Sequence, residues 1–264
     1  MTDNSTPPTD LEATRDPPAD PTDPEEFEAI KRHHGSRAAL YAVLAGTFCY
    51  PDGDAVAELT DEETISAMRS AANRLGCGDA AADLASALTA PDLDAETFAD
   101  GYDALFGLPG DDGEYPVVPY EADYTARDDL SAKQRRIATV SGLLSAFDLE
   151  RADDYHERRD HVAVELELMQ VLAARRAIVE ADSDDDRGED LALAEATVLE
   201  EHLADFLPGL AHDIGSAAGR EGVPEAAADV YVAAADLATA LLERDRAGHP
   251  DAPTADATNG GEPA

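Results

Sequence analysis

The sequence predicts an all-α protein: a single compact helical bundle of about nine or ten helices, flanked by disordered acidic tails. Three observations predict this fold class. Alanine and leucine dominate the hydrophobic residues, which make up 44% of the 264-residue chain, and both favour helices. Apolar side chains recur at the three- and four-residue spacing of a helix face. The only candidate strand, PVVPY (116–120), is too short to count.

The first half of the chain contains four expected helices, bounded by residues that start or stop helices. Pro51 ends the first because proline cannot continue a helix. Asp61 and Asp94 can accept hydrogen bonds from the free backbone N–H groups at the starts of two others. The expected helical segments are 34–49, 61–75, 79–89 and 94–106.

The second half begins with a long loop, 107–119, whose glycines and prolines break any regular element. Large aromatic residues flank this loop, so we expect it to be pinned to the core. We expect the helix after 189 to stop at Pro208 and a new one to follow. The expected helices are 131–147, 160–180, 189–206, 209–218 and 225–244, with an acidic connector at 182–188.

Both ends of the chain have the composition of disordered tails. Residues 1–24 hold six prolines and six acidic residues, with almost nothing apolar, and such a segment cannot bury a core. The C-terminal DAPTADATNGGEPA is similar. The expected organisation is a tail at 1–27, one helical domain at 28–245 and a second tail at 246–264.

The charge of the chain is extreme, with 58 acidic residues against 19 basic ones and a formal net charge of −39. Such a surface repels nucleic acid and anionic lipid, so neither is an expected partner. The acid is spread through every segment, which favours adaptation to a salt-filled cytoplasm over the alternative, a docking patch for a basic ligand. Because molar salt shortens the Debye length to about 3 Å, recognition should depend on apolar burial and close hydrogen-bonded pairs.

The sequence carries no sign of export or membrane insertion. The N-terminal MTDNSTPPTD lacks the basic start and apolar core of a secretory signal. The longest apolar run, 38–50, is too short to cross a bilayer. Cys49 and Cys77 form neither a CxxC pair nor a zinc-binding spacing, so we expect small core residues in a reducing compartment. The expected localisation is cytoplasmic.

The segment ERRDHVAVELELM (157–169) concentrates polar residues at the start of an apolar helix. Asp160 can cap the first turn of that helix. His161 lies near the positive end of the helix dipole and should therefore be mostly neutral. Glu165 lies one turn further on, and a His–Glu pair at this spacing can also be simple helix support.

Metal binding and catalysis receive little support from this segment. A zinc site needs three or four convergent ligands, and HxxxE supplies only two. Four other histidines have no matching spacing: His33, His34, His156 and His202. GxSxG, a phosphate-binding loop and a placed Cys–His pair are missing from the sequence. No metal and no cofactor is predicted, and a small acid/base hydrolase using Asp160, His161 and Glu165 is a lesser alternative.

Five motifs follow one another along the chain: LYAVLAGTFCYPD (40–52), YDALFGLPG (102–110), PYEADY (119–124), ERRDHVAVELELM (157–169) and EEHLADFLPGL (200–210). Their order resembles the TorD/DmsD/NarJ family of molybdoenzyme maturation chaperones, and the resemblance covers about 35–242. The DHxxxELxxM pattern, preceded by an LFG-loop-PYE segment, is the most specific element. Two positions differ: Arg159 stands where the family usually has proline, and Phe206 where it often has tryptophan.

The resemblance implies a compact helical chaperone and not an enzyme. Such a chaperone would bind the twin-arginine signal peptide of a molybdopterin oxidoreductase, or its catalytic subunit, and assist cofactor insertion before export. The implied peptide-binding residues are Tyr120, Glu121, Tyr124, Asp160, His161 and Glu165. Carboxylates among them would hold the paired arginines, and an apolar groove between helices would hold the apolar stretch.

Nitrate reductase assembly factors share this fold, so a second reading stays open. In that reading the protein acts on the folded catalytic subunit of a membrane-bound reductase rather than on a signal peptide. Family members also exchange segments between chains, which makes a homodimer one expected state.

Overall fold

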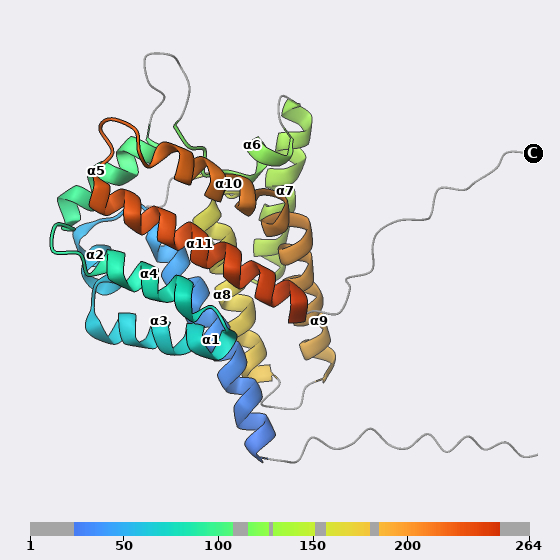
Figure 1. Ribbon diagram of the computed structural model, residues 1–264. Helices are drawn as coiled ribbons and strands as arrows, with labels where there is room; N and C mark the ends of the chain where they lie inside the picture. Colours follow the sequence, from blue (N-terminus) through green and yellow to red (C-terminus); the bar gives the residue numbers. More distant parts are fainter. Residues whose placement is uncertain (1–23, 108–115, 127–128, 151–156, 180–184, 249–264) are drawn as a thin grey trace, which may run out of the picture.

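The computed structural model describes residues 24–107, 116–126, 129–150, 157–179 and 185–248. These residues form helices α1 to α11 and the π-helical segment η2 (Figure 1). Strand pairing within them is limited to an isolated antiparallel bridge between Tyr120 and His161. The prediction of an all-α protein is confirmed.

The first six helices are α1 (Pro24–Phe48), α2 (Gly53–Leu59), α3 (Glu62–Leu75), α4 (Gly78–Leu88), α5 (Ala95–Phe106) and α6 (Glu121–Thr125). The later elements are α7 (Leu130–Ala146), α8 (Val162–Val179), α9 (Asp185–Thr197), η2 (Val198–Leu203), α10 (Ala204–Ala217) and α11 (Glu225–Gly248). Four of these helices are preceded by an N-cap aspartate. Its carboxylate accepts hydrogen bonds from backbone N–H groups of the first turn, which would otherwise have no partner within the helix. These caps are Asp52, Asp61, Asp94 and Asp129.

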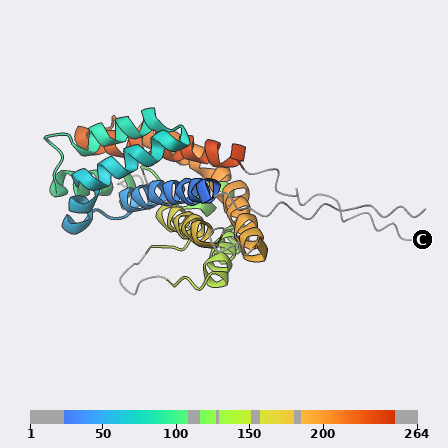
Figure 2. The same cartoon turned by 90° about the horizontal axis from the view of Figure 1, so that it is seen from below.

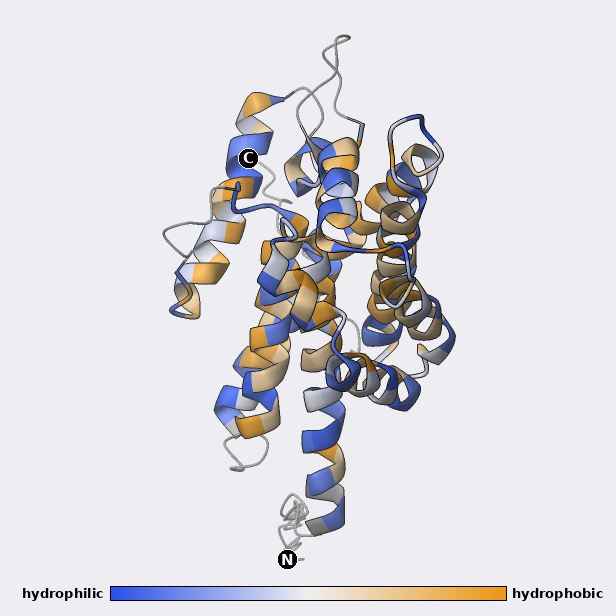
Figure 3. Ribbon diagram, turned by 90° about the vertical axis from the view of Figure 1, so that its left-hand side faces the viewer, coloured by the Kyte–Doolittle hydropathy of each residue, from blue (hydrophilic) through white to orange (hydrophobic). Residues whose placement is uncertain are grey.

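The helices stack in layers around α1. Helix α1 packs along α8 on one side and against α3 on the other, and α4 links α3 to α11. Figure 2 shows this order, with α3, α4 and α11 above α1 and with α8 below it. The N-terminal part of α1 extends beyond the other helices and is hydrophilic (Figure 3).

An aromatic cluster fixes α5 and α1 against α11. Tyr231 of α11 is fully buried, and its ring centroid lies 5.1 Å from that of Phe98 and 6.4 Å from that of Phe48. The two helices α5 and α11 approach so closely that a Cβ atom at Gly101 would lie 2.2 Å from the Cβ of Ala227. Glycine is therefore required at this crossing for steric reasons.

A buried charged cluster joins the first and last helices. The Arg37 Nε donates to Asp245 Oδ2 at 2.9 Å, and its Nη1 donates to Glu195 Oε1 at 2.9 Å. Tyr41 and Arg176 complete the pairing, through Asp245 at 2.7 Å and Glu195 at 2.9 Å. The charges offset one another in an interior that would otherwise exclude them, so α1, α8, α9 and α11 are held in one arrangement.

Several predicted boundaries were wrong. Helix α1 begins at Pro24, ten residues before the expected start, because proline is favoured at the first helical position. The boundary expected between the tail and the domain at 27 therefore falls inside a helix. Helices α2 and α6 were not predicted, and α9 begins inside the acidic connector expected at 182–188. Residues 108–115 of the expected loop lie outside the described residues, and its end is held by a hydrogen bond from Val117 N to Leu105 O at 2.9 Å.

The expected break at Pro208 was also wrong, since Pro208 lies inside α10. The irregularity comes one turn earlier, in η2, where the Ala204 N–H bonds the carbonyl oxygen of Leu199. This i to i+5 register is the wider turn of a π-helix, a form often found at functional sites. Because the hydrogen-bond register changes before Pro208, η2 and α10 form one continuous helical segment that contains both His202 and Pro208.

Candidate functional site

Two motifs that are far apart in the sequence meet through backbone hydrogen bonds. The Glu121 N–H donates to the Asp160 carbonyl oxygen at 2.9 Å, and the Val162 N–H donates to the Pro119 carbonyl oxygen at 2.9 Å. These two bonds form the antiparallel bridge named above. Helices α6 and α8 therefore start side by side, and the PYE segment faces the Asp-His pair.

Asp160 caps α6 and not, as predicted, its own helix α8. Its Oδ2 accepts the Ala122 N–H at 3.0 Å, and its side chain is fully buried. Arg158 donates to both carboxylate oxygens, from Nε to Oδ1 at 3.0 Å and from Nη2 to Oδ2 at 2.6 Å. The prediction failed because the cap rule considers only the helix that follows in the sequence, whereas the bridge turns Asp160 toward α6.

His161 provides an acceptor at the start of α8. Its Nδ1 accepts the Ala163 N–H at 3.2 Å, which places the proton of the neutral ring on Nε2. Burial, together with the nearby charge of Arg158, lowers the pKa of His161 to about 3. The neutral ring agrees with the sequence prediction, but burial rather than the helix dipole is the main cause.

The buried contact between residues 119–122 and residues 160–163, where α6 and α8 begin, is called the junction. A half-exposed charged surface covers it. The Arg158 guanidinium lies over the Tyr120 ring, 4.3 Å from its centroid, and its Nη1 donates to Asp123 Oδ2 at 2.8 Å. Asp123 also pairs with Lys133, and the Tyr120 hydroxyl donates to the Glu157 carboxylate. Arg158 is 37% exposed, so this surface presents a cation held between two carboxylates.

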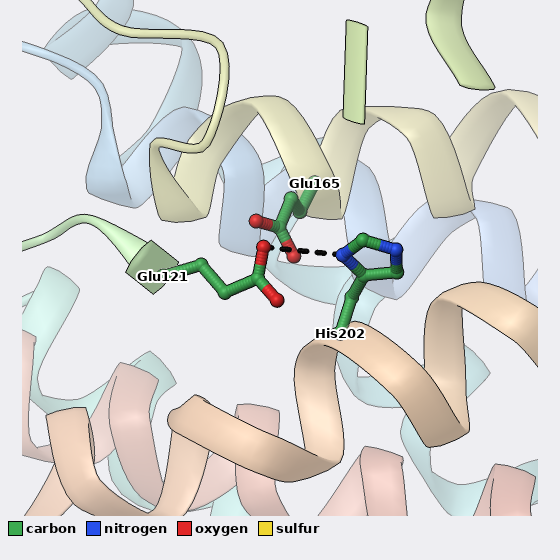
Figure 4. A group of neighbouring side chains, drawn as sticks. All are labelled: Glu121, Glu165 and His202. Carbon is green, nitrogen blue, oxygen red and sulfur yellow. Dashed lines mark hydrogen bonds and ion pairs between the residues drawn. The ribbon is translucent and has the colours of Figure 1, made fainter. Parts of the chain in front are cut away.

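Beneath that surface, Glu121, Glu165 and His202 form a buried cluster (Figure 4). Their ligand-type atoms lie within 4.8 Å of one another, and the residues are at most 1% exposed. His202 Nδ1 is 3.1 Å from Glu121 Oε2, and Arg136 Nε is 3.1 Å from Glu121 Oε1. Burial, followed by the charge of Glu121, raises the pKa of Glu165 well above its usual range. Carboxylate and imidazole donors of this kind are also a potential set of metal ligands.

Tyr124 fastens α6 to α10. Its hydroxyl donates to Asp213 Oδ2 at 2.9 Å, and its ring lies 6.1 Å from that of Phe206. A Cβ at Gly209 would lie 3.0 Å from the Tyr124 ring, so the missing side chain allows close contact. Phe206 itself is fully buried. The aromatic residue at this position therefore supports the packing of α6.

The structure brings all six sequence-predicted site residues into one region but hides most of their polar groups. Four of them are at most 1% exposed: Glu121, Asp160, His161 and Glu165. Tyr120 and Tyr124 are half-buried and reach the surface. A direct clasp of peptide arginines by the buried carboxylates would therefore require α6 to move.

The predicted site did not include three further residues of this junction: Arg136, Arg158 and His202. His202 lies in the EEHLADFLPGL segment, which was noted as a motif but was not assigned a role. His202 could have been found only by predicting which histidine the tertiary packing places next to Glu165. Arg136 carries no local signal, because its partners Glu121 and Asp205 belong to other helices.

An apolar groove of about 440 Å³ lies between α1, α2, α3 and α8. We call it the α1–α3 groove. Its α1 wall is a stripe of small residues at helical spacing, and Glu58 is its one charged lining residue. Its lining is Ala39, Ala42, Val43, Gly46, Ala55, Glu58, Leu59, Thr64, Ala67, Met68 and Gln170. The volume lies within the usual range for small binding sites.

Helical packing, a half-exposed junction and an apolar groove are features of a binding protein. Within the part of the chain described, none of the helices is both long and apolar enough to span a membrane. The model of the family described as nitrate reductase delta subunit matches residues 71–212, just over half of the chain, and the chain belongs to this family. Membership confirms the resemblance to the TorD/DmsD/NarJ chaperones and indicates a chaperone of molybdoenzyme assembly. No match was found among curated proteins or solved structures.

Proposed function

We propose that this protein acts in the cytoplasm on the catalytic subunit of a nitrate-reductase-type molybdoenzyme and assists insertion of its molybdopterin cofactor before export. The observation that carries the proposal is the family match over 71–212. That range contains every residue of the junction and most of the helices that position them.

The contact with the client is proposed to have two parts. Tyr120 and Tyr124 supply half-exposed aromatic surface at the junction, while the buried residues Glu121, Asp160, His161 and Glu165 hold the two tyrosines in place. The α1–α3 groove receives an apolar segment of the client. Tyrosine is common at protein–protein interfaces because its ring is apolar while its hydroxyl group can stay in contact with water.

Two client regions could make this contact, the twin-arginine leader and the folded catalytic subunit. The burial of the four polar side chains favours the folded subunit, because an arginine pair cannot reach those carboxylates in the arrangement described. The leader is then a second contact, with its apolar stretch as the part that the groove accepts.

Co-expression with a client tests the proposal. The chain is produced with the full-length catalytic subunit of a nitrate-reductase-type enzyme or with the same subunit lacking its leader, and complexes are isolated in molar KCl. We expect both forms of the client to co-elute with the chaperone, the full-length form more tightly. Tyr120→Ala and Tyr124→Ala should weaken both complexes, whereas Tyr50→Ala, which removes another exposed tyrosine, should not.

The cofactor content of the client gives the functional readout. In cells that lack the chaperone gene, the catalytic subunit should accumulate with little molybdopterin. Full cofactor loading in those cells would reject the role in maturation. Binding that depends wholly on the leader would instead leave the maturation role intact and reject contact with the folded subunit.

A further inference from the structure

The cluster of Glu121, Glu165 and His202 has more acceptor capacity than the surrounding protein satisfies. The three side chains come from three elements: the start of α6, the first turn of α8 and the π-helical segment η2. Figure 4 shows the two carboxylates and the ring converging on one point. Their converging atoms lie within 4.8 Å of one another, and each residue is at most 1% exposed.

Glu165 is the group whose surroundings are incomplete. Within the part of the chain described, no hydrogen bond meets either of its carboxylate oxygens or the Nε2 of His202. Arg136 pairs with the Oε1 atom of Glu121. The other carboxylate oxygen of Glu121, Oε2, faces His202. A buried ionised carboxylate without a partner is costly, so the cluster requires either a proton or a cation.

The backbone places His202 in this cluster through an unusual conformation. The π-helical turn over Val198–Leu203 changes the direction in which side chains leave the helix, and π-bulges cluster at functional sites. His161 is the other histidine of this region, but its Nδ1 already accepts the Ala163 N–H. The pair that the sequence suggested, His161 with Glu165, is therefore replaced by His202 with Glu165 and Glu121.

We propose that Glu121, Glu165 and His202 form a binding site for one divalent transition-metal ion, with Zn²⁺ as the preferred occupant. Imidazole nitrogens and carboxylate oxygens are both ligands that zinc accepts, and three protein ligands leave a fourth position for water. Mg²⁺ and Ca²⁺ prefer sites built of oxygen ligands alone, and the histidine disfavours both. Tetrahedral ligands about 2.1 Å from zinc are roughly 3.4 Å apart. The three donors, which lie within 4.8 Å of one another, would therefore have to move closer by up to about 1.4 Å.

The ion would join α6, α8 and η2 at one point. Because Tyr120 directly precedes α6 and Tyr124 lies near its end, a bound ion would fix the position of the proposed client surface. The ion's role is structural: it replaces the proton that the carboxylate pair otherwise needs. The inference concerns this chain alone and stands independently of which client it serves.

Calorimetric titration of the full-length protein with Zn²⁺, after chelator treatment and in molar KCl, tests the site. High salt screens the many surface carboxylates, which would otherwise bind cations weakly. We expect one ion per chain, and a Tm raised by about 5 °C or more when free Zn²⁺ is in roughly 100-fold excess over Kd. Mg²⁺ at the same concentration should leave Tm unchanged, and Co²⁺ should give visible absorption of a low-symmetry site.

Three variants separate this site from surface binding. Glu165→Gln keeps the shape of the neutral carboxyl group and should fold, and His202→Gln removes the nitrogen ligand. Each should weaken Zn²⁺ binding at least about 100-fold, since even loss of an outer-shell partner costs 10–100-fold. Glu195→Gln removes another fully buried carboxylate and should leave the Zn²⁺-dependent rise in Tm intact. Stoichiometric binding that persists in both cluster variants, or no binding by the unaltered chain, would overturn the proposal.

Discussion

The Asp160 carboxylate accepts the backbone N–H of Ala122 at 3.0 Å, so a residue at the start of α8 caps α6 across a β-bridge. This single contact couples the two motifs that carry the family resemblance. It also explains why α6, a helix of only five residues, is ordered at all. A helix this short has almost no stability of its own, and it depends on Asp160 at its start and on Tyr124 packed against α10.

Replacement of Asp160 should therefore destabilise the whole junction. Asp160→Ala leaves the Ala122 N–H unsatisfied and removes two of the three carboxylate oxygens that accept hydrogen bonds from Arg158. We expect a loss of about 3 kcal/mol in the free energy of unfolding. Urea unfolding in high salt measures this loss. Asp94→Ala, which removes the exposed cap of α5, is the matched control and should cost only about 1 kcal/mol. Equal losses in the two variants would contradict the coupling described.

Acid should weaken the fold through His161. The folded protein holds the pKa of His161 at about 3, against 6.5 for an unperturbed histidine, so below pH 6.5 the unfolded chain binds a proton that the folded chain refuses. Stability from this group is complete above pH 6.5 and is lost as pH falls toward 3. Between about pH 8 and about pH 5 the loss should be about 2 kcal/mol.

The variant His161→Asn isolates that contribution, because asparagine keeps a capping acceptor but does not titrate. The difference in stability between the unaltered chain and this variant should narrow by the stated amount as pH falls. His212→Asn, at an exposed position, should show the full pH dependence of the unaltered chain. A parallel pH dependence in His161→Asn would show that His161 titrates normally.

Two fully buried glutamates should respond in opposite ways to the same substitution. The pKa of Glu165 is raised by burial and by Glu121, so Glu165 favours folding while protonated and this contribution is lost as pH rises through the folded pKa. In the presence of chelator, Glu165→Gln should therefore match or exceed the stability of the unaltered chain at alkaline pH. Glu195→Gln breaks pairs with Arg37 and Arg176 and should cost about 3 kcal/mol. Thermal unfolding of both variants across pH makes the comparison.

Client binding through the α1–α3 groove should resist salt. Apolar contacts persist or strengthen in salts excluded from the protein surface, whereas ion pairs are screened. Titration of a labelled client leader at increasing KCl should show constant or rising affinity. Ala42→Leu fills the groove and should weaken binding about tenfold or more, since it displaces at least one buried apolar group. Ala240→Leu adds the same bulk on α11 and should leave the affinity unchanged. A steep loss of affinity as salt rises would show that ion pairs, and not apolar contacts, make the main contribution to binding.

Two glycine-to-alanine substitutions should have opposite effects on stability. Gly101→Ala forces a Cβ to within 2.2 Å of Ala227 and should cost about 1–3 kcal/mol through overpacking between α5 and α11. Gly142→Ala changes an exposed position of α7 with nothing within 4 Å of the added atom, and it should add about 0.5–1 kcal/mol through helix propensity. Chemical denaturation of both variants tests whether the crossing at Gly101 is as close as described.

Local physics made much of the fold predictable from the sequence. Asp61 and Asp94 cap helices where they were expected to, because capping depends on neighbours in the chain. Helix α2 was missed since seven residues give too little periodicity, and the path through Pro208 was missed since the π-helical turn before it leaves no sequence pattern.

The candidate site was predictable as a region but not as a geometry. Tyr120, Glu121, Asp160 and Glu165 do meet, because the motif order reports which segments the family brings together. Their burial, and the arrival of His202 beside Glu165, depend on how α6 and α10 pack, and no local spacing encodes that. Counting ligands along one helix therefore underestimated the donors available at Glu165.

The Arg37–Asp245 contact has a consequence for biosynthesis. Its two residues are 208 positions apart, so at ribosomal rates of 5–20 residues per second the arginine waits about 10–40 s for its acid. Throughout that interval the Arg37 side chain lacks the Asp245 carboxylate with which it pairs in the folded protein. A protein proposed to assist the assembly of another enzyme would therefore leave one of its own buried charges without its final partner during most of its synthesis.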